Sequence, residues 1–421
     1  MTFEVHVYLR DGCALFDYLA RVLRHGFKTI PSSLTTAAGY RLLNMQLSNQ
    51  PGTQARLNLS GLDRLLADSD TISRLISCEV GLLTNHASTT YGGVPASKAL
   101  NDKLIAAGGR PISLFAPEHG IQLSVGAGEK VNHSADRLTG LQVHSLYADE
   151  RLENDATFNE LDTLVIDLRD IGVRCFTYAA TAARAACKAL ERNIEVILCD
   201  RPNPLGPNTD GPRPESGRNS LLAFFDVPFV HGHTIAELLT NWVTNHGAEN
   251  PCIVYPADHA GPAALGWTPP SPALSHPDAV AAYAGLVLLE ATNISEGRGS
   301  SLSFRSISAP GLRALPLSEV LGSWNTGFAA APTLVTSMRG EYAGVPLPGI
   351  QIWPQSGKQQ KPLALGIQLL AWLRHEHPDF AWLLPQNEDS GASIDKLFGR
   401  PDLREQLDAG VSASRIMAAW R

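Results

Sequence analysis

The sequence predicts an α/β protein, with a Rossmann-like, doubly wound, mostly parallel sheet domain followed by a smaller α+β domain. Short apolar runs alternate with helical stretches of about ten to fifteen residues as far as residue 256, which is typical of βαβ units. After residue 256 prolines become frequent and the alternation ends. We therefore expect an N-terminal extension of unknown role at 1–54, a Rossmann-like domain at 55–256, and a smaller auxiliary C-terminal domain at 257–421.

The expected elements follow in chain order. In the first domain we expect strands at 80–84, 112–115, 161–168, 195–200 and 252–255, and helices at 96–107, 177–192 and 234–245. In the second we expect helices at 278–290, 362–375 and 402–407 and a strand at 349–353. Gly108 ends the first helix, because glycine adopts the left-handed conformation that closes many helices. Pro117 stops the strand at 112–115, because proline cannot donate a ladder hydrogen bond.

Composition excludes several function classes. The chain has 421 residues, 44% of them hydrophobic and 18% charged, as in soluble globular proteins. A net charge of −7 without a Lys/Arg cluster argues against nucleic acid as a partner. The longest apolar run, 279–289, is too short to span a membrane and fits a buried helix. Residues 1–11 lack the basic and apolar regions of a signal peptide, so we expect a cytoplasmic protein.

Polar residues follow the ends of four predicted strands. They are Asn85-His86, Glu118-His119, the segment from Asp167 to Asp170, and Asp200-Arg201. Parallel strands bring their carboxyl ends to one edge of the sheet, where ligands bind in open α/β folds. The pattern predicts a polar cleft at that edge. The alternative is that these side chains cap helices and turns, Asp170 and Thr177 above all.

Two glutamates are the best candidates for catalysis. Glu118 directly follows a buried strand, where partial burial favours the protonated form that a general acid needs. Glu296 precedes Gly297-Arg298-Gly299, a turn whose arginine suits a substrate carboxylate. Two carboxylates across a cleft are the usual equipment for glycoside hydrolysis. The alternatives are a turn residue at Glu118 and a surface loop residue at Glu296.

Other polar residues suit ligand recognition. Arg174, Asp200, Arg201 and Asn203 lie on the strand-end loops, where they would recognise a polar or anionic ligand or form an internal salt-bridge network. Trp267, before Pro269-Pro270, would stack on a sugar or belong to a rigid linker.

No cofactor or metal is expected. The chain lacks G-x-G-x-x-G, a phosphate-binding P-loop, G-x-S-x-G and H-E-x-x-H. The pairs His231-x-His233 and His375-x-His377 have no third ligand nearby, so a metal site is the less favoured reading. The six cysteines are scattered without a C-x-x-C pair and are expected to be small buried residues.

The chain resembles the bacterial peptidoglycan exo-β-N-acetylmuramidases of the NamZ type over roughly residues 55–421. The resemblance rests on many ordered segments, each weak alone. They are Val80-Gly-Leu-Leu-Thr-Asn85, Ala116-Pro-Glu-His-Gly120, Ala127-Gly-Glu-Lys130, Asp167-Leu-Arg-Asp-Ile-Gly-Val-Arg174, Phe176-Thr-Tyr178, Asp200-Arg-Pro-Asn-Pro-Leu-Gly206, His231-Gly-His-Thr234, Pro269-Pro-Ser-Pro272 and Thr292-Asn-Ile-Ser-Glu-Gly-Arg-Gly299.

This resemblance implies a hydrolase that releases N-acetylmuramic acid from the non-reducing ends of peptidoglycan fragments, in cell wall turnover and muropeptide recycling. It implies that Glu118 is the catalytic glutamate. It also implies a cleft that binds a small saccharide, with candidate substrate-binding residues Asn85, His119, Arg174, Tyr178, Asp200, Arg201, Asn203, His231, Asn293 and Arg298. The lactyl carboxylate of muramic acid would explain an arginine there.

The chain departs from the family pattern at several positions. Val230 replaces an arginine, Ala291 replaces the glycine of Glu-Gly-Thr-Asn, and the stretch between Ser303 and Gly349 is shortened. Two alternatives therefore stay open. One is a divergent enzyme that acts on another carboxylated amino sugar or in a specialised biosynthetic pathway, and the other is a saccharide-binding protein without catalysis.

Overall fold

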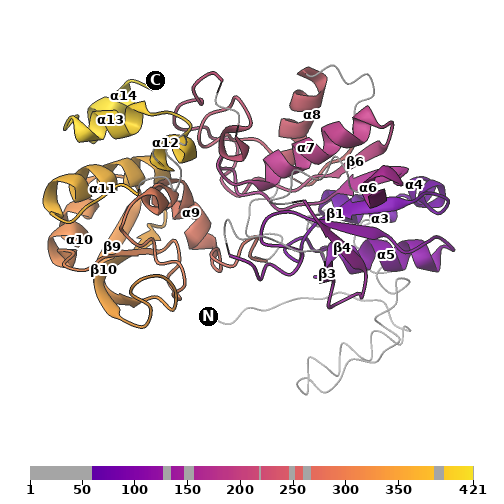
Figure 1. Cartoon of the computed structure of the whole chain (residues 1–421), viewed down its shortest axis with the longest axis horizontal. Helices are drawn as coiled ribbons and strands as arrows, with labels where there is room; N and C mark the ends of the chain where they lie inside the picture. The colour runs from indigo at the N-terminus through magenta and orange to yellow at the C-terminus, as the bar shows by residue number, and fades with distance from the viewer. Residues whose placement is uncertain are drawn as a thin grey trace, which may run out of the picture. The chain divides into compact units, whose positions relative to one another are not determined.

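The computed structural model of the chain describes residues 59–126, 134–146, 156–217, 220–245, 252–258, 267–383 and 393–420. The expected N-terminal extension at 1–54 lies outside these ranges. Residues 58–421 form one compact unit with two sheets, one of seven strands and one of three. Figure 1 shows the seven-stranded sheet with its helices at the right and the smaller sheet with its helices at the left.

The larger sheet has the strand order of a Rossmann fold. Its order is β3 (Ser134–Ala135), β4 (Gln142–Ser145), β2 (Ser113–Ala116), β1 (Val80–Leu83), β5 (Thr163–Ile166), β6 (Glu195–Cys199) and β7 (Ile253–Tyr255). All neighbours pair in parallel except β3 with β4. The six parallel strands taken in chain order give the sequence 3-2-1-4-5-6, whose winding reverses between β1 and β5. The predicted doubly wound sheet is confirmed.

Helices cover both faces of this sheet. One face carries α3 (Gly61–Ala67), α4 (Ser69–Leu75) and α5 (Ala96–Ala106), and the other carries α7 (Tyr178–Glu191) and α8 (Ile235–Asn245), while the short α6 (Ala156–Asn159) precedes β5. Successive side chains of a strand point to opposite faces, so Leu82 packs with the α3–α5 face and Leu83 with the α7 face. This two-sided burial explains why the strands read as continuous apolar runs.

The second domain is built on an antiparallel sheet in the order β8 (Ser306–Ser308), β10 (Pro346–Pro354) and β9 (Phe328–Thr336). Its helical segments are α9 (Pro277–Leu286), the 3₁₀ segment η5 (Val287–Ala291), α10 (Ala314–Ser323), α11 (Pro362–Glu376), α12 (Ser393–Phe398), α13 (Asp402–Asp408) and α14 (Ala413–Ala418). The expected strand at 349–353 lies inside β10, and the expected helix at 278–290 is divided between α9 and η5. The smaller α+β domain is confirmed.

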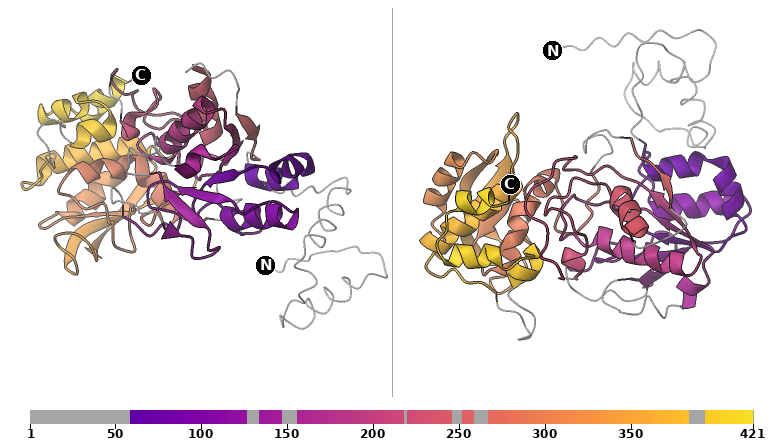
Figure 2. Two further views of the ribbon diagram at one scale, coloured as in Figure 1. Left: turned by 45° about the vertical axis from the view of Figure 1, so that its right-hand side comes forward. Right: turned by 90° about the horizontal axis from the view of Figure 1, so that it is seen from above.

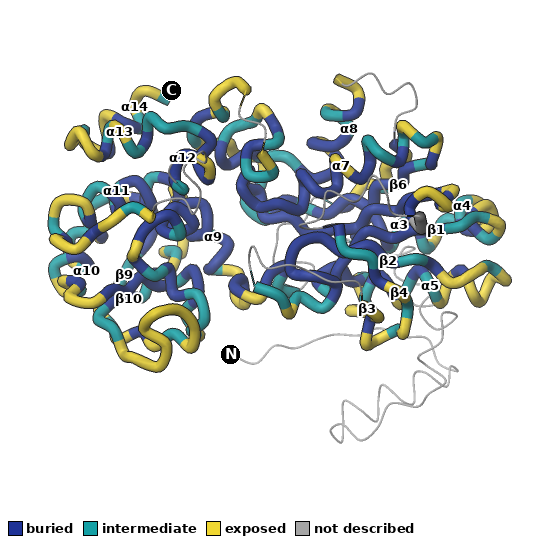
Figure 3. Tube along the Cα trace, viewed as in Figure 1, coloured by how far each residue is buried: buried dark blue, intermediate teal, exposed yellow. Residues whose placement is uncertain are grey.

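One hydrophobic core joins the two domains. A single cluster of buried side chains runs from the α7 face of the larger sheet through α9 and η5 to the smaller sheet and α11. Figure 3 shows this burial along both domains, and Figure 2 gives the same arrangement from two other directions. The two domains are therefore held against each other by one continuous hydrophobic core. Among the described residues, no helix is long and apolar enough to cross a membrane.

Candidate active site

Glu118 stands in a tight turn directly after β2. The backbone N–H of Gly120 donates to the carbonyl of Pro117 over 3.1 Å, which closes the turn. His119 and Gly120 both adopt left-handed conformations, with φ of 70° and 73°. A histidine pays about 1 kcal/mol or more for that conformation. Its ring is held by a 2.8 Å contact between Nδ1 and the carbonyl of Val125.

The Glu118 carboxylate is bonded to the first turn of α7. Thr177 Oγ1 donates a hydrogen bond to Glu118 Oε2 over 2.5 Å, and both residues are buried. Thr177 occupies the N-cap position of α7, but its side chain makes no capping bond to that helix. The expected capping role of Thr177 is therefore wrong in this respect, because its hydroxyl is turned to the glutamate.

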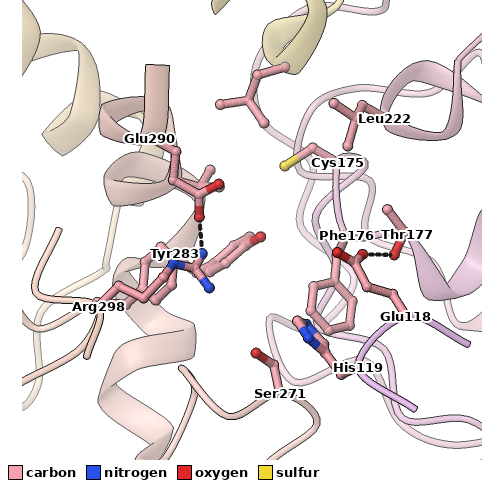
Figure 4. A pocket seen from close by; sticks show the side chains of 13 residues that line it. Glu118, His119, Cys175, Phe176, Thr177, Leu222, Ser271, Tyr283, Glu290 and Arg298 are labelled. Atoms are coloured by element: carbon pink, nitrogen blue, oxygen red, sulfur yellow. Dashed lines mark hydrogen bonds and ion pairs between the residues drawn. The ribbon is translucent and has the colours of Figure 1, made fainter. Parts of the chain in front are cut away.

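Glu118 and Thr177 line a pocket of about 280 Å³ between the two domains. The first domain contributes Glu118, His119, Cys175, Phe176, Thr177 and Leu222, and the segment between β7 and α9 contributes Ser271. The second domain contributes Tyr283, Val287, Glu290, Arg298, Phe304 and Leu397. Figure 4 shows these two groups of side chains on facing walls.

The facing wall holds a network of two glutamates and one arginine. Arg298 donates through Nη2 to Glu290 and through Nε to Glu296, the latter over 2.9 Å, while its guanidinium lies 5.1 Å from the ring centre of Phe304. Desolvation raises the pKa of Glu290 to about 7, against the lowering effect of Arg298, with the Glu296 and Glu118 charges adding to the rise. Burial lowers the pKa of Arg298, but the two glutamates outweigh it and raise the pKa overall.

Tyr178 lies next to this pocket rather than in its lining. It is completely buried, and its hydroxyl donates to the carbonyl of Pro270 over 2.5 Å. Burial raises the pKa of the Tyr178 phenol, and the charge of Glu118 adds to the effect. Asn85, which follows β1, is also buried and accepts a 3.1 Å bond from the N–H of Ala87.

Part of the predicted cleft edge is an internal polar network. Arg201 forms a two-pronged ion pair with Asp167, Nε to Oδ1 over 2.5 Å and Nη2 to Oδ2 over 2.9 Å. Asp200 accepts from the N–H of Ala236 over 3.2 Å, and its pKa is raised by burial. Asn203 donates to the carbonyl of His233 over 3.0 Å. These contacts fit the salt-bridge alternative that the sequence left open.

Three further predicted residues have partners outside the pocket lining. Arg174 donates to the carbonyls of Pro212, Val227 and Phe398 over 2.9, 2.8 and 2.5 Å. His231 Nε2 lies 3.2 Å from Asp170 Oδ2. The side-chain amide of Asn293 donates to the carbonyl of Asp379 over 2.6 Å. Among the predicted site residues, Glu118, His119 and Arg298 line the pocket. The substrate-binding roles of the others stay predictions.

The metal and thiol expectations can be placed in the fold. The ring of His231 lies 6.3 Å from that of His233, whereas His375 is exposed and 2.9 Å from Glu376. No group of three His, Cys, Asp or Glu side chains in the described ranges is placed to hold a metal ion. The cysteines at 78, 175, 187, 199 and 252 are free thiols, and Cys13 lies outside the described residues.

Sequence reasoning missed Glu290 and Tyr283 as pocket residues. Both belong to the segment 278–290, for which the sequence predicts a buried helix. Two signals were available for Glu290: it is a single acid at the end of the apolar run, eight positions before Arg298, and it begins the family's Glu-Gly-Thr-Asn pattern. Glu290 lies on η5, directly after α9, and lines the pocket.

Comparisons with known proteins agree with this architecture. The family model described as "Exo-beta-N-acetylmuramidase NamZ, N-terminal" matches residues 80–278, and its C-terminal counterpart matches residues 281–421. The chain is 28% identical over 419 residues to the peptidoglycan beta-N-acetylmuramidase NamZ of Bacillus subtilis (strain 168), covering 96% of this chain and 95% of that protein.

Two crystal structures of DUF1343 family proteins from Bacteroides fragilis NCTC 9343 share the fold. The first has a TM-score of 0.74 at 24% identity, covering 87% of this chain and 95% of the other. The second has a TM-score of 0.62 at 24% identity, with coverages of 86% and 94%. From the two matched family models and the relative aligned along nearly the whole chain, the protein belongs to the NamZ exo-β-N-acetylmuramidase family.

Proposed function

We propose that this protein is a glycoside hydrolase that releases N-acetylmuramic acid from the non-reducing end of peptidoglycan-derived saccharides, with Glu118 as the acid/base. Family membership and the Bacillus subtilis relative, which is named as a peptidoglycan beta-N-acetylmuramidase, support the reaction class. The single observation that carries the residue assignment is the Glu118 carboxyl group, buried in a pocket that has a second carboxylate on the opposite wall.

The chemistry needs a proton donor at the glycosidic oxygen. When the bond between the anomeric carbon and that oxygen breaks, the departing alkoxide must receive a proton, which Glu118 would give. The hydrogen bond from Thr177 fixes the orientation of the carboxyl group that makes this transfer. The second carboxylate compensates the positive charge that develops on the sugar ring.

The pocket also suits a sugar ring. Phe176, Tyr283 and Phe304 give it apolar surface, while Ser271 and His119 give it polar groups. Small-molecule sites commonly combine an apolar lining with a few placed polar groups. Arg298 is already paired with two glutamates, so its charge is balanced before any substrate carboxylate arrives.

A role in the recycling of muropeptides inside the cytoplasm is part of this proposal. The five described cysteines are free thiols, which fits a reducing compartment. Cell fractionation followed by an activity assay tests the location. Activity confined to the medium or the envelope would contradict it.

The reaction is tested with chromogenic substrates. The 4-nitrophenyl β-glycosides of N-acetylmuramic acid and of N-acetylglucosamine differ only in the lactyl ether. We expect hydrolysis of the muramide with kcat/KM at least about 100-fold above that of the glucosaminide. Preference for the glucosaminide, or for a carboxylated amino sugar other than muramic acid, would contradict the proposed substrate. Binding of muramyl saccharides without turnover would contradict the proposed activity.

A further inference from the structure

The pair of glutamates predicted from the sequence does not share one pocket. Glu296 is buried, and the described residues that line the pocket with Glu118 do not include it. Its Oε1 accepts from Arg298 Nε over 2.9 Å, and its backbone carbonyl accepts from the N–H of Phe304 over 2.8 Å. Glu296 therefore holds the Arg298 side chain and the backbone of Phe304, both of which line the pocket, without lining the pocket itself.

Glu290 occupies the position that Glu296 was expected to fill. It stands on η5 and lines the same pocket as Glu118, on the wall that the second domain provides. Figure 4 shows its carboxylate with Arg298 on one side of the open space, and Glu118 with Thr177 on the other. Its side chain is 31% exposed, against 10% for Glu296, so it is the more accessible of the two glutamates.

We propose that Glu290 is the second catalytic carboxylate of the hydrolysis, acting on the anomeric carbon opposite Glu118, and that Arg298 positions it. This inference rests on the proposed function. In this assignment Glu296 is a positioning residue, because it acts on the reaction only through its bond to Arg298.

The step balances with these two groups. Glu118 gives its proton to the glycosidic oxygen, and the bond from that oxygen to the anomeric carbon breaks. Glu290 supplies the new electron pair, either by bonding to the carbon directly or by taking a proton from the water that bonds to it. On the direct route, water later cleaves the bond between Glu290 and the sugar, while Glu118 takes the proton of that water. On the water route, Glu290 returns the proton to solvent and Glu118 regains one.

The charges around Glu290 suit this role. The bonded Arg298 guanidinium favours the ionised form, which the step needs, and holds one oxygen in place. Desolvation and the nearby Glu296 and Glu118 charges oppose ionisation and raise the pKa of Glu290 to about 7. The carboxylate form of Glu290 that the step needs is therefore the majority form above about pH 7.

Replacement of each glutamate separates the roles. With 4-nitrophenyl β-N-acetylmuramide, we expect Glu290→Gln to lower kcat by about 100-fold or more and KM to change little. Glu296→Gln removes a positioning contact and not a reacting group, so it should lower kcat by less than about 10-fold. Sodium azide should restore turnover by Glu290→Ala, with a glycosyl azide as product, because the small anion fills the space of the lost carboxylate.

Azide rescue also carries the test if Glu290→Gln is poorly folded, since a merely structural glutamate gives no glycosyl azide. Near-wild-type kcat in a folded Glu290→Gln variant, or a larger loss in Glu296→Gln than in Glu290→Gln, would overturn the assignment. A wild-type protein that is inactive on every muramide would instead overturn the proposed function. The two failures are therefore distinguishable.

Discussion

Thr177 Oγ1 donates a hydrogen bond to Glu118 Oε2 over 2.5 Å, and this bond joins the carboxyl end of β2 to the first turn of α7. The Thr177 hydroxyl makes this bond and does not cap α7. The bond also places the carboxyl group beside the positive end of a 14-residue helix. The orientation of Glu118 therefore depends on a residue far from it in sequence.

Removal of the Thr177 hydroxyl should impair turnover. Thr177→Val keeps the shape but removes the donor that orients the Glu118 carboxyl group, and misplacement of a reacting group can cost about 100-fold in rate. We expect kcat to fall by about 10- to 100-fold with KM nearly unchanged. Thr177→Ser restores the donor and should recover most of the activity. An equal loss in the valine and serine variants would show that packing, not the hydrogen bond, is what matters.

The pKa of Glu290 predicts a pH-dependent stability difference. Desolvation raises the pKa of this group in the folded state to about 7 from an ordinary value of 4.5, with Arg298 opposing the rise. A raised pKa means that its contribution to stability is fully present below about pH 4.5 and is lost as pH rises toward 7. Glu290→Gln cannot ionise, so its melting temperature relative to wild type should increase between pH 5 and pH 8. A difference that stays constant with pH would contradict the shift.

Arg201 should matter first for folding. It is buried and forms a two-pronged ion pair with Asp167, and its Nη2 also donates to the carbonyl of Thr89. Arg201→Met leaves a buried carboxylate unpaired and should lower the free energy of unfolding by about 3–5 kcal/mol in urea titration. The control is Arg74→Met, which breaks the more exposed pair with Glu195 and should cost about 1 kcal/mol or less. Equal losses of unfolding free energy in the two variants would contradict the larger contribution expected of the buried Arg201–Asp167 pair.

The space around Gly285 is too small for an added methyl group. A Cβ at this position in α9 would collide with the backbone of α11 at Pro362 and Gly366. We expect Gly285→Ala to destabilise the protein by about 1–3 kcal/mol, measured by thermal unfolding. Gly322 is exposed in α10 with open space around it, so Gly322→Ala should instead stabilise by up to about 1 kcal/mol. A stabilised Gly285→Ala variant would refute the close crossing of the two helices.

The larger sheet was predictable because its signals are local. The central strands β1, β2, β5 and β6 are short, mostly apolar runs that are buried on both faces, whereas the polar strand β4 (Gln142–Ser145) was not predicted. Strand β9 and the full length of β10 were not predicted, since Pro332, Pro346 and Pro348 argue against strands. Their pairing with each other overrides that local preference, Pro332 facing Ile350 and Pro348 facing Leu334.

The wall that carries Glu118 was more predictable than the facing wall, where Arg298 was the one lining residue that the sequence indicated. The position of Glu118 directly after a buried strand indicates a functional residue, and the resemblance to the family implies that it is the catalytic glutamate. Glu290 is the first residue of the family's Glu-Gly-Thr-Asn pattern, but it follows no buried strand, and its place on the pocket wall depends on packing between domains that are distant in sequence. The same holds for Arg174, whose partners include the carbonyl of Phe398 at the end of α12. Contacts of this kind follow from the assembled core and not from any local pattern.

The most direct test of the account compares wild type with Glu118→Gln on 4-nitrophenyl β-N-acetylmuramide and on a muramyl disaccharide. Wild type should release N-acetylmuramic acid from both. The variant should lose at least about 100-fold in kcat on the disaccharide, and less on the nitrophenyl substrate, whose leaving group needs little protonation. Hydrolysis of both substrates by the folded variant at the wild-type rate would contradict the assignment of Glu118 as the acid/base.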